Sequence, residues 1–542
     1  MSKTTNSFSL FRFMLLVFTL LYLQGSVELQ GQTTQGNILG TITDESGAFV
    51  VGAEVTVNSL DTGFKRETLS NKDGFYDVAH LEPGNYQVSA QLSGFKQFIR
   101  NQVVLESGKV VRIDITLKVG ELSEKVEVSA VTPVIDADTA RIAEVAVERT
   151  LRDIPLAGRS GANFMIGLMP GVYAAYGAGG YTMHGSRGGA TFDTIDGVYT
   201  GYSIEGRMNA TVRPDQEALK EIRVESVNAS AEFSRSAVVT QTTKSGTNDF
   251  HGQATWNYQN AVLSARDFFA AKRPRGLPIN NIFLNGGGPV IIPGLYDGRN
   301  KTFFFVHLDG QEMEADAPFT RNVPTLAMRK GDFSALGTIR DPLTGQPFPG
   351  SIIPSNRLNQ NALRYVERFY PLPTENLALP ANNFIKTVCC AGRSDRAYDF
   401  RGDQKLSNSN TMFARIFWND FSIRTNGAPP NFEEYNNENR IQLSAIVADT
   451  HVFSPNLINE FRLGFYRRPA TSQGPLNAKQ IVDEIGLTGY PYALPSDVTG
   501  LPSVGITGLL GVGSGAVTRY RDNNFDAVDN ITIARGNRTC KS

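Results

Sequence analysis

The chain has 542 residues, with 52 Lys and Arg against 53 Asp and Glu and a net charge of -1. This length exceeds one ordinary hydrophobic core and implies two or more units. A nearly neutral chain has no overall basic field, so we expect no nucleic-acid partner. The 52 Gly, 33 Phe and 18 Tyr favour an all-β protein with many strands and turns over a helical one.

The N-terminus has the pattern of a secretory signal. Lys3 and Arg12 precede an apolar run over residues 13–23. That run is too short to span a bilayer as a helix. A buried helix is the weaker alternative, because the polar stretch 24–35 follows. We therefore predict a signal peptide over residues 1–31, with no clear cleavage site.

Three cysteines in so long an exported chain argue against a disulfide scaffold. Cys389 and Cys390 are adjacent and Cys540 is nearly terminal. The adjacent pair forms either a strained vicinal disulfide or two idle thiols in a loop, and we favour the thiols. The five His are scattered without ligand spacing, so we expect neither a metal site nor a cofactor.

Residues 37–119 have turn signals about every ten residues, which is typical of a β-sandwich. Between the turns, apolar residues alternate with polar ones, as in Val55 and Val57, so each strand has one face to bury. Asp44 and Asp73 are imaginable calcium ligands, but both lie in turns where Asp is expected to bind the local backbone. We prefer the turn role.

Three stretches in this region resemble the carboxypeptidase-regulatory-like domain. They are "GTITDESGAFVVGAEVTV", "TLSNKDGFYDVAHLEPGNYQVSAQLSGFKQ" and "VRIDITLKVG". The resemblance implies a transthyretin-like β-sandwich over residues 32–119 without catalytic activity. Nothing in the stretch supplies a zinc site, a nucleophile with its base, or a carboxylate pair. We therefore predict that the chain is not an enzyme.

Residues 120–249 begin with an exposed, strand-prone segment, "ELSEKVEVSAVTP", in which "KVEVSA" is similar to a TonB box. A TonB box is recognised by adding a strand to the sheet of an energy-coupling protein of the TonB type, which requires exposed backbone more than particular side chains. An ordinary linker strand is an equal alternative. The predicted partner-binding residues are Lys125, Val126, Glu127, Val128, Ser129 and Ala130.

Four motifs follow in order: "LRDIPLAGRS", "LMPGV", "HGSRGGATFDTIDGV" and "VESVNASAEFSRSAVVTQTTKSGTNDFHG". Together they resemble the plug of TonB-dependent receptors of the Oar-like type, although "FSRSAVVTQ" lacks a Gly that family members usually carry. Asp193 and Asp196 suggest acid/base catalysis, but the adjoining Gly197 indicates a tight turn. From the resemblance we predict ligand contacts in the plug loops at Tyr173, Tyr176, Tyr181 and Arg187.

From residue 250 the chain has the pattern of an outer-membrane β-barrel. In residues 250–260, apolar side chains alternate with hydrophilic ones, as lipid outside and a wet lumen inside require. The connections between strands are alternately short and long, the parity of periplasmic turns and external loops. The eight predicted strands lie near residues 250–260, 280–290, 301–310, 398–406, 411–420, 441–453, 457–466 and 523–533.

Two patterns within these strands, an aromatic cluster and an "RGD" tripeptide, resemble functional motifs. Phe303, Phe304 and Phe305 with Phe413, Phe417 and Trp418 suggest an aromatic girdle at the membrane interface, although Phe is also common in strand packing. The "RGD" at residues 401–403 falls within a predicted strand, so we do not expect an adhesion motif.

Further segments of the chain also resemble the receptor family, such as "KTFFFVHLDGQE" and "HVFSPNLINEFRLGFYRR". The resemblance therefore covers nearly the whole exported chain. Receptors with a plugged lumen have about 22 strands, whereas we predict about eight over residues 250–542. An open edge in lipid leaves backbone groups unpaired. We therefore expect a partial barrel, and the chain to be a fragment of a longer receptor, a frameshifted product or one piece of a split gene.

The resemblance implies a protein of the cell outer membrane that takes up a substrate with energy from a TonB-type partner. Its expected contacts are outer-membrane lipid and a small-molecule, oligosaccharide or peptide ligand, and carbohydrate binding is one expectation. The alternatives are a surface or adhesion protein without transport, and a non-functional fragment. An exported sugar-processing enzyme is a third hypothesis, but no carboxylate pair supports it.

Overall fold

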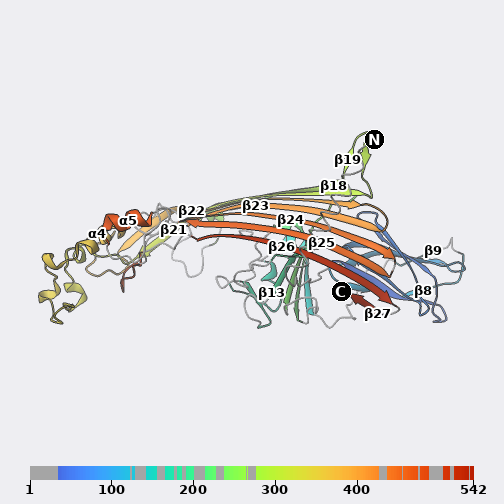
Figure 1. Cartoon of the computed structure of the whole chain (residues 1–542), viewed down its shortest axis with the longest axis horizontal. Helices are drawn as coiled ribbons and strands as arrows, with labels where there is room; N and C mark the ends of the chain where they lie inside the picture. Colours follow the sequence, from blue (N-terminus) through green and yellow to red (C-terminus); the bar gives the residue numbers. More distant parts are fainter. Residues whose placement is uncertain are drawn as a thin grey trace, which may run out of the picture.

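The structure is a computed structural model in which three parts follow one another: a sandwich, a smaller mixed sheet and a long curved sheet (Figure 1). Most of its regular elements are strands. It describes residues 34–121, 125–128, 142–154, 165–175, 180–185, 191–200, 214–227, 237–263, 265, 276–425, 436–454, 456–473, 477–487, 504–512, 518–535 and 538–541. The predicted signal peptide lies outside the described residues.

The first part is a β-sandwich with one core. One sheet has the order β4-β1-β7, with β8 also paired to β1, and the other has the order β3-β2-β5-β6-β9. Inward-facing residues of both sheets, such as Ile38, Val57 and Val88, are fully buried in this core. The strands are β1 (Gly36–Asp44), β2 (Glu54–Ser59), β3 (Lys65–Leu69), β4 (Phe75–Leu81), β5 (Gly84–Gln91), β6 (Gln97–Leu105), β7 (Val110–Arg112), β8 (Ile115–Leu117) and β9 (Lys125–Val128).

The predicted turns hold the sandwich strands in place. Oδ1 of Asp44 accepts hydrogen bonds from the backbone N–H groups of Ser46 and Ala48 at 2.8 and 2.9 Å. Asn71 does the same in the next turn for Asp73 and Phe75. Asp44 therefore binds the backbone of its own turn, as the sequence predicts.

The second part is the plug, a five-stranded sheet with the order β10-β15-β16-β13-β14 and a separate β11-β12 hairpin. Every described side chain of β13 and β16 is buried, because the sheet is covered on both faces. Its elements are β10 (Ile142–Val147), α2 (Glu148–Asp153), β11 (Val172–Ala175), β12 (Gly180–Met183), β13 (Thr191–Ile195), β14 (Val198–Tyr199), η1 (Gln216–Ala218), β15 (Leu219–Val227) and β16 (Ala237–Thr243).

The third part is a nine-stranded antiparallel sheet, β17-β18-β21-β22-β23-β24-β25-β26-β27, that curves over the plug (Figure 1). All eight predicted strands are present and are joined in the predicted order, and the alternation of short and long connections is confirmed. The strands are β17 (His251–Gln259), β18 (Gly276–Pro289), β21 (Thr302–Arg321), β22 (Phe384–Lys405), β23 (Asn410–Thr425), β24 (Asn436–Ser454), β25 (Leu457–Gln473), β26 (Thr518–Arg535) and β27 (Arg538–Lys541), with a small β19 (Ile291–Ile292) and β20 (Tyr296–Asp297) hairpin in one short connection.

The two faces of this sheet differ in polarity. One face exposes apolar side chains, including Trp256 at 67% and Phe525 at 82%. The other face buries charged groups such as Arg415 and Glu460. This arrangement, apolar outside and polar inside, is the one expected of a barrel wall in lipid.

The predicted aromatic girdle is wrong for most of its members. Phe413 and Phe417 are buried on the inner face, where they pack with the plug residues Val198 and Ile195. Phe303 and Phe305 are also buried, whereas Trp418 is 43% exposed. The plug packs against these inward positions, which are therefore apolar in part.

The long connections at one end of the sheet form a folded lobe (Figure 1). Its helices are α4 (Gln360–Phe369), which the Asn359 side chain caps, and α5 (Ala478–Ile485), which ends at Gly486 with φ of 76°. Both helices pack into one small core that includes Phe369, Ile481 and Val512. The remaining helical turns of the lobe are η3 (Met328–Lys330), η4 (Ser334–Leu336), η5 (Pro349–Ser351) and η6 (Ser355–Arg357), and η2 (Ala261–Leu263) follows β17.

Cys389 and Cys390 lie within strand β22, so the prediction of a loop at this pair is wrong. The strand begins at Phe384, well before the predicted start at residue 398. Cys540 lies in β27. Within the part of the chain that is described, no helix has the length and apolar character needed to cross a bilayer.

Candidate functional site: the junction of plug, sheet and sandwich

The plug meets the curved sheet at the turn between β13 and β14. Asp196 and Gly197 have φ of 49° and 78°, and Ile195 pairs with Val198 across the turn. A two-residue hairpin with positive φ at both positions is a type I′ turn, for which Asp-Gly is a preferred sequence. The predicted tight turn at "TIDGV" is therefore present, and it carries Asp196 to the inner face of the sheet.

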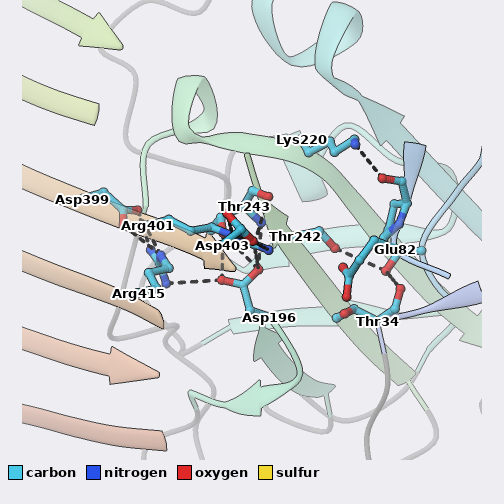
Figure 2. A network of polar contacts seen from close by, with 12 residues as sticks. Thr34, Glu82, Asp196, Lys220, Thr242, Thr243, Asp399, Arg401, Asp403 and Arg415 are labelled. Carbon is cyan, nitrogen blue, oxygen red and sulfur yellow. Dashed lines mark hydrogen bonds and ion pairs between the residues drawn. The ribbon is translucent and has the colours of Figure 1, made fainter. Parts of the chain in front are cut away.

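Asp196 is the centre of a buried polar network (Figure 2). It is 2% exposed, and its carboxylate accepts hydrogen bonds from the backbone N–H and the Oγ1 of Thr243 at 3.0 and 2.8 Å. Its oxygens also lie 3.4 Å from Nη1 of Arg401 and 3.8 Å from Nη1 of Arg415. The plug is thus bound to strands β22 and β23 by charge.

Carboxylates of the sheet complete this network. Arg415 donates to Asp399 at 2.6 Å, and Arg401 donates to Asp403 at 2.8 Å. Three carboxylates therefore surround two guanidinium groups, so the buried positive charges are compensated. Figure 2 shows Asp399, Arg401 and Arg415 on the sheet and Asp196 on the plug.

Strand β14 makes a second contact with the sheet, at β25 and β26. The backbone N–H of Tyr199 donates to Oδ2 of Asp526 at 3.0 Å. Gly464 faces Val198 so closely that a Cβ at Gly464 would lie 2.3 Å from Cγ1 of that side chain. A glycine in the sheet therefore makes room for the plug.

The sandwich is attached to the end of the sheet that has the short connections. Nε2 of His80 lies 2.7 Å from Oγ1 of Thr532, and Nδ1 lies 3.8 Å from Oε2 of Glu460. Gln35 donates to Oγ1 of Thr450 at 3.2 Å. The sandwich therefore contacts strands β24, β25 and β26 directly.

The sandwich also contacts the plug. The backbone N–H of Ser107 donates to Oε1 of Glu221 at 2.5 Å, and Nζ of Lys220 donates to the carbonyl oxygen of Pro83 at 2.5 Å. Burial raises the pKa of Glu221 to about 7, and the hydrogen bond from Ser107 opposes this rise. The three parts thus meet at one junction.

The junction residues keep the plug in place through ion pairs and hydrogen bonds, and their arrangement does not indicate catalysis. Each carboxylate described above is engaged by arginine, threonine or backbone donors. In the part of the chain that is described, no group of three or more His, Cys, Asp or Glu side chains has the geometry of a metal site. The arrangement can retain the plug and release it when these contacts break.

The TonB-box-like segment is part of the sandwich sheet. Lys125, Val126, Glu127 and Val128 form β9, which pairs in parallel with β6 from Gln97 to Arg100. Strand β9 is at the edge of that sheet. Ser129 and Ala130 lie outside the described residues. The role of this segment in partner binding stays a prediction.

The predicted ligand-contact residues fall on the β11-β12 hairpin or beyond the described part. Tyr173 is 70% exposed on β11, and Tyr181 on β12 pairs with Ala174. The hairpin thus places these two tyrosines on neighbouring strands. Tyr176 and Arg187 lie outside the described residues, and ligand contact at all four positions stays a prediction.

Sequence reasoning missed the sheet side of the junction. Arg401 and Asp403 belong to the "RGD" tripeptide, which lies in strand β22 as predicted. The available signal was the run of charged residues at every second position, Asp399, Arg401 and Asp403, on the inner face of one strand. Nothing in the sequence linked His80 or Gln35 to this junction.

Comparisons with known proteins agree with this architecture. The chain matches the outer membrane beta barrel domain over residues 242–542 and the carboxypeptidase regulatory-like domain over residues 37–118. It is 26% identical to the TonB-dependent transporter Oar of Myxococcus xanthus over 236 residues, which are 42% of this chain. The chain thus spans 22% of the length of this curated relative.

Two solved structures are similar at low identity. The transporter YddB of Escherichia coli is 9% identical, with a TM-score of 0.45, over 74% of this chain and 47% of that one. The ferric enterobactin receptor PfeA of Pseudomonas aeruginosa is 11% identical, with a TM-score of 0.39, over 72% and 46%. From the match over residues 242–542, the chain belongs to the outer membrane beta barrel domain family, and it resembles TonB-dependent receptors of the Oar-like type.

Proposed function

We propose that the chain is a component of an outer-membrane transporter that takes up an unidentified substrate with energy from a TonB-type partner. The observation that carries the proposal is the plug held under a barrel wall by Asp196 and two arginines. The apolar outer face of the wall supports a position in the outer membrane. No residue is assigned covalent chemistry in this scheme.

The steps of transport follow from the two ends of the sheet. Substrate binds at the lobe and at plug loops such as the hairpin with Tyr173. The partner adds a strand to the segment 125–130, which lies next to the plug in sequence, and pulls on it. Tension then breaks the contacts of Asp196 and moves the plug, so that a path opens.

A second candidate is a surface protein that contacts other cells through its long loops. The folded lobe favours it, because the lobe has its own core around Phe369 and Ile481. The lobe also exposes apolar side chains, including Leu343 at 83% and Leu372 at 63%. This role needs no energy-coupling partner.

A proline substitution in β9 separates the two candidates. Val126→Pro removes the backbone N–H and limits strand pairing, whereas the control Val126→Thr keeps the N–H and a β-branched side chain. We expect the immobilised periplasmic domain of a TonB-type protein to retain the full chain and the threonine variant but to lose the proline variant. Equal retention of both variants overturns the assignment of the segment. Cell adhesion that is unchanged by Val126→Pro supports the second candidate.

A further inference from the structure

A cavity of about 540 Å³ lies where the sandwich, the plug and the curved sheet meet. Its lining includes Phe64 and Arg66 from the sandwich, Lys244 from the end of the plug, and Phe303, Lys405 and Phe413 from the sheet. Small-molecule sites have volumes of about 300 to 1,000 Å³. The cavity therefore has the size of a binding site for a small ligand. Junction residues such as His80, Thr243 and Arg401 also line it, but Arg66 and Lys405 take no part in the junction contacts described above.

Arg66 is a buried cation in this cavity. It occupies an inward-facing position of strand β3, paired with Val57 of β2, where an apolar residue is expected. The residue is 8% exposed, and its Nε has no hydrogen-bond partner among the described residues. Burial lowers the pKa of Arg66 to about 10. A buried charge of this kind is costly unless a counter-ion is present.

A second cation, Lys405, lies near the same aromatic ring as Arg66, that of Phe64. The Cζ of Arg66 lies 5.0 Å from the centroid of the Phe64 ring, and the Nζ of Lys405 lies 5.3 Å from it. Within the described part of the chain, neither group has a carboxylate within 4.0 Å, whereas Arg401 in the same cavity has Asp403 and Asp196. The carboxylate of Glu82 attracts Arg66 from farther away, but it is exposed and accepts from Gln35 at 2.6 Å.

The charge of this pair indicates the class of ligand. A monocarboxylate supplies one negative charge, whereas a phosphate monoester has a charge of about −1.5 to −2 at neutral pH and several acceptor oxygens. The planar guanidinium group suits two oxygens of a phosphate, and the ammonium group supplies a compact charge. A phosphate group therefore matches two neighbouring cations better than a carboxylate does.

We propose that this cavity binds a small phosphate-bearing anion, with Arg66 and Lys405 as the binding cations and Phe64 as part of the wall. The ligand meets the sandwich, the plug and the sheet at once, so its binding stabilises their junction. This site goes beyond the proposed transport function and does not depend on it.

Isothermal titration calorimetry of the full chain in a non-ionic detergent with inorganic phosphate tests the proposal. We expect saturable binding that weakens with ionic strength, and a loss of affinity of about tenfold or more in Arg66→Gln. Lys72→Gln is the matched control, because it removes the same charge from an exposed position of the sandwich that does not line the cavity. Absence of saturable binding, or an equal loss in the control, overturns the proposal.

Mixed micelles with phosphatidic acid, whose headgroup is a phosphate monoester, distinguish the source of the phosphate. If these micelles displace inorganic phosphate from the wild-type chain and micelles with phosphatidylcholine do not, the headgroup of a lipid is the ligand. If micelles with phosphatidic acid do not displace it, the ligand is a free phosphate compound. Both results support phosphate binding in the cavity and differ only in the source of the phosphate group.

Thermal unfolding of Arg66→Met separates a binding role from a structural role. Without phosphate, we expect this variant to unfold at the same or a higher temperature than the wild type, because an uncompensated buried charge is removed. Phosphate should raise the unfolding temperature of the wild type only. A lower unfolding temperature in the variant, with no response of the wild type to phosphate, would show that Arg66 is purely structural.

Discussion

Oδ1 of Asp196 and Nη1 of Arg401 lie 3.4 Å apart, although the two residues are 205 positions apart in the chain. One belongs to the plug and the other to the inner face of the sheet. Their contact is buried, so it is screened little by salt. The plug is therefore held at a defined position by charge as well as by packing.

Asp196→Asn is expected to destabilise the docked plug. The substitution removes a buried negative charge from between Arg401 and Arg415, and breaking such a pair costs about 3 to 5 kcal/mol. Asp399 and Asp403 remain as partners, so the lower end of this range applies. Denaturant unfolding and the rate of proteolysis in the plug measure the effect.

The control for this variant is Asp483→Asn, which breaks the exposed ion pair with Lys479 on α5. Exposed pairs contribute about 0 to 1 kcal/mol, so we expect little change. Similar losses in Asp196→Asn and Asp483→Asn would contradict a special role for the buried network.

Gly464→Ala is expected to hinder the seating of the plug. A Cβ at this position lies 2.3 Å from Cγ1 of Val198, so the two strands must move apart, at a cost of about 1 to 3 kcal/mol. Gly310→Ala on β21 is the matched control, because no heavy atom lies within 4 Å of its Cβ. The unfolding temperature and the protection of the plug from protease provide the measurement, and equal values for the two variants speak against the close contact.

Stability of the junction between plug and sandwich is expected to fall as pH rises from about 4.5 to about 7. Burial raises the pKa of Glu221 from 4.5 to about 7, so the folded state favours the protonated acid. The free-energy cost of ionising Glu221 in the folded protein is absent below the pKa of the unfolded state. It is complete above the pKa of the folded state, where it reaches roughly 3 kcal/mol.

Glu221→Gln removes this titration while keeping an oxygen that accepts from Ser107. Unfolding free energies of wild type and variant at pH 4.5 and 8 should therefore differ most at the higher pH. Burial also raises the pKa of Asp77 to about 6, which adds a fall common to both proteins. A difference between wild type and variant that does not change with pH would refute the assignment to Glu221.

The sequence predicted the order of the strands but not their lengths. Side-chain alternation marks the part of each strand that faces lipid, whereas beyond it the strands continue through backbone hydrogen bonds. Strand β22 therefore starts at Phe384, where it pairs with Arg321 of β21, rather than at residue 398. The buried Phe413 and Phe417 were misplaced because the pattern of a barrel assumes a wet lumen, whereas a plug covers them here.

The site was predictable only in part. The turn at Asp196 and Gly197 follows from local sequence, because Asp-Gly sets the hairpin by itself. The partners of Asp196 depend on how two separate sheets meet, and no local pattern encodes that. His80 is a similar instance, since its partners Thr532 and Glu460 come from strands more than 350 residues later.

The sandwich contacts the short-connection end of the sheet, and the lobe lies at the opposite end (Figure 1). With a lipid bilayer around the wall, these two ends face different aqueous compartments. A molecule that docks on the lobe and a molecule that docks on the sandwich therefore never meet in solution. Binding at the lobe can therefore affect binding at the sandwich only through the protein itself. A membrane-impermeant label applied to intact cells would mark lobe lysines such as Lys330 and leave sandwich lysines such as Lys72 unmarked.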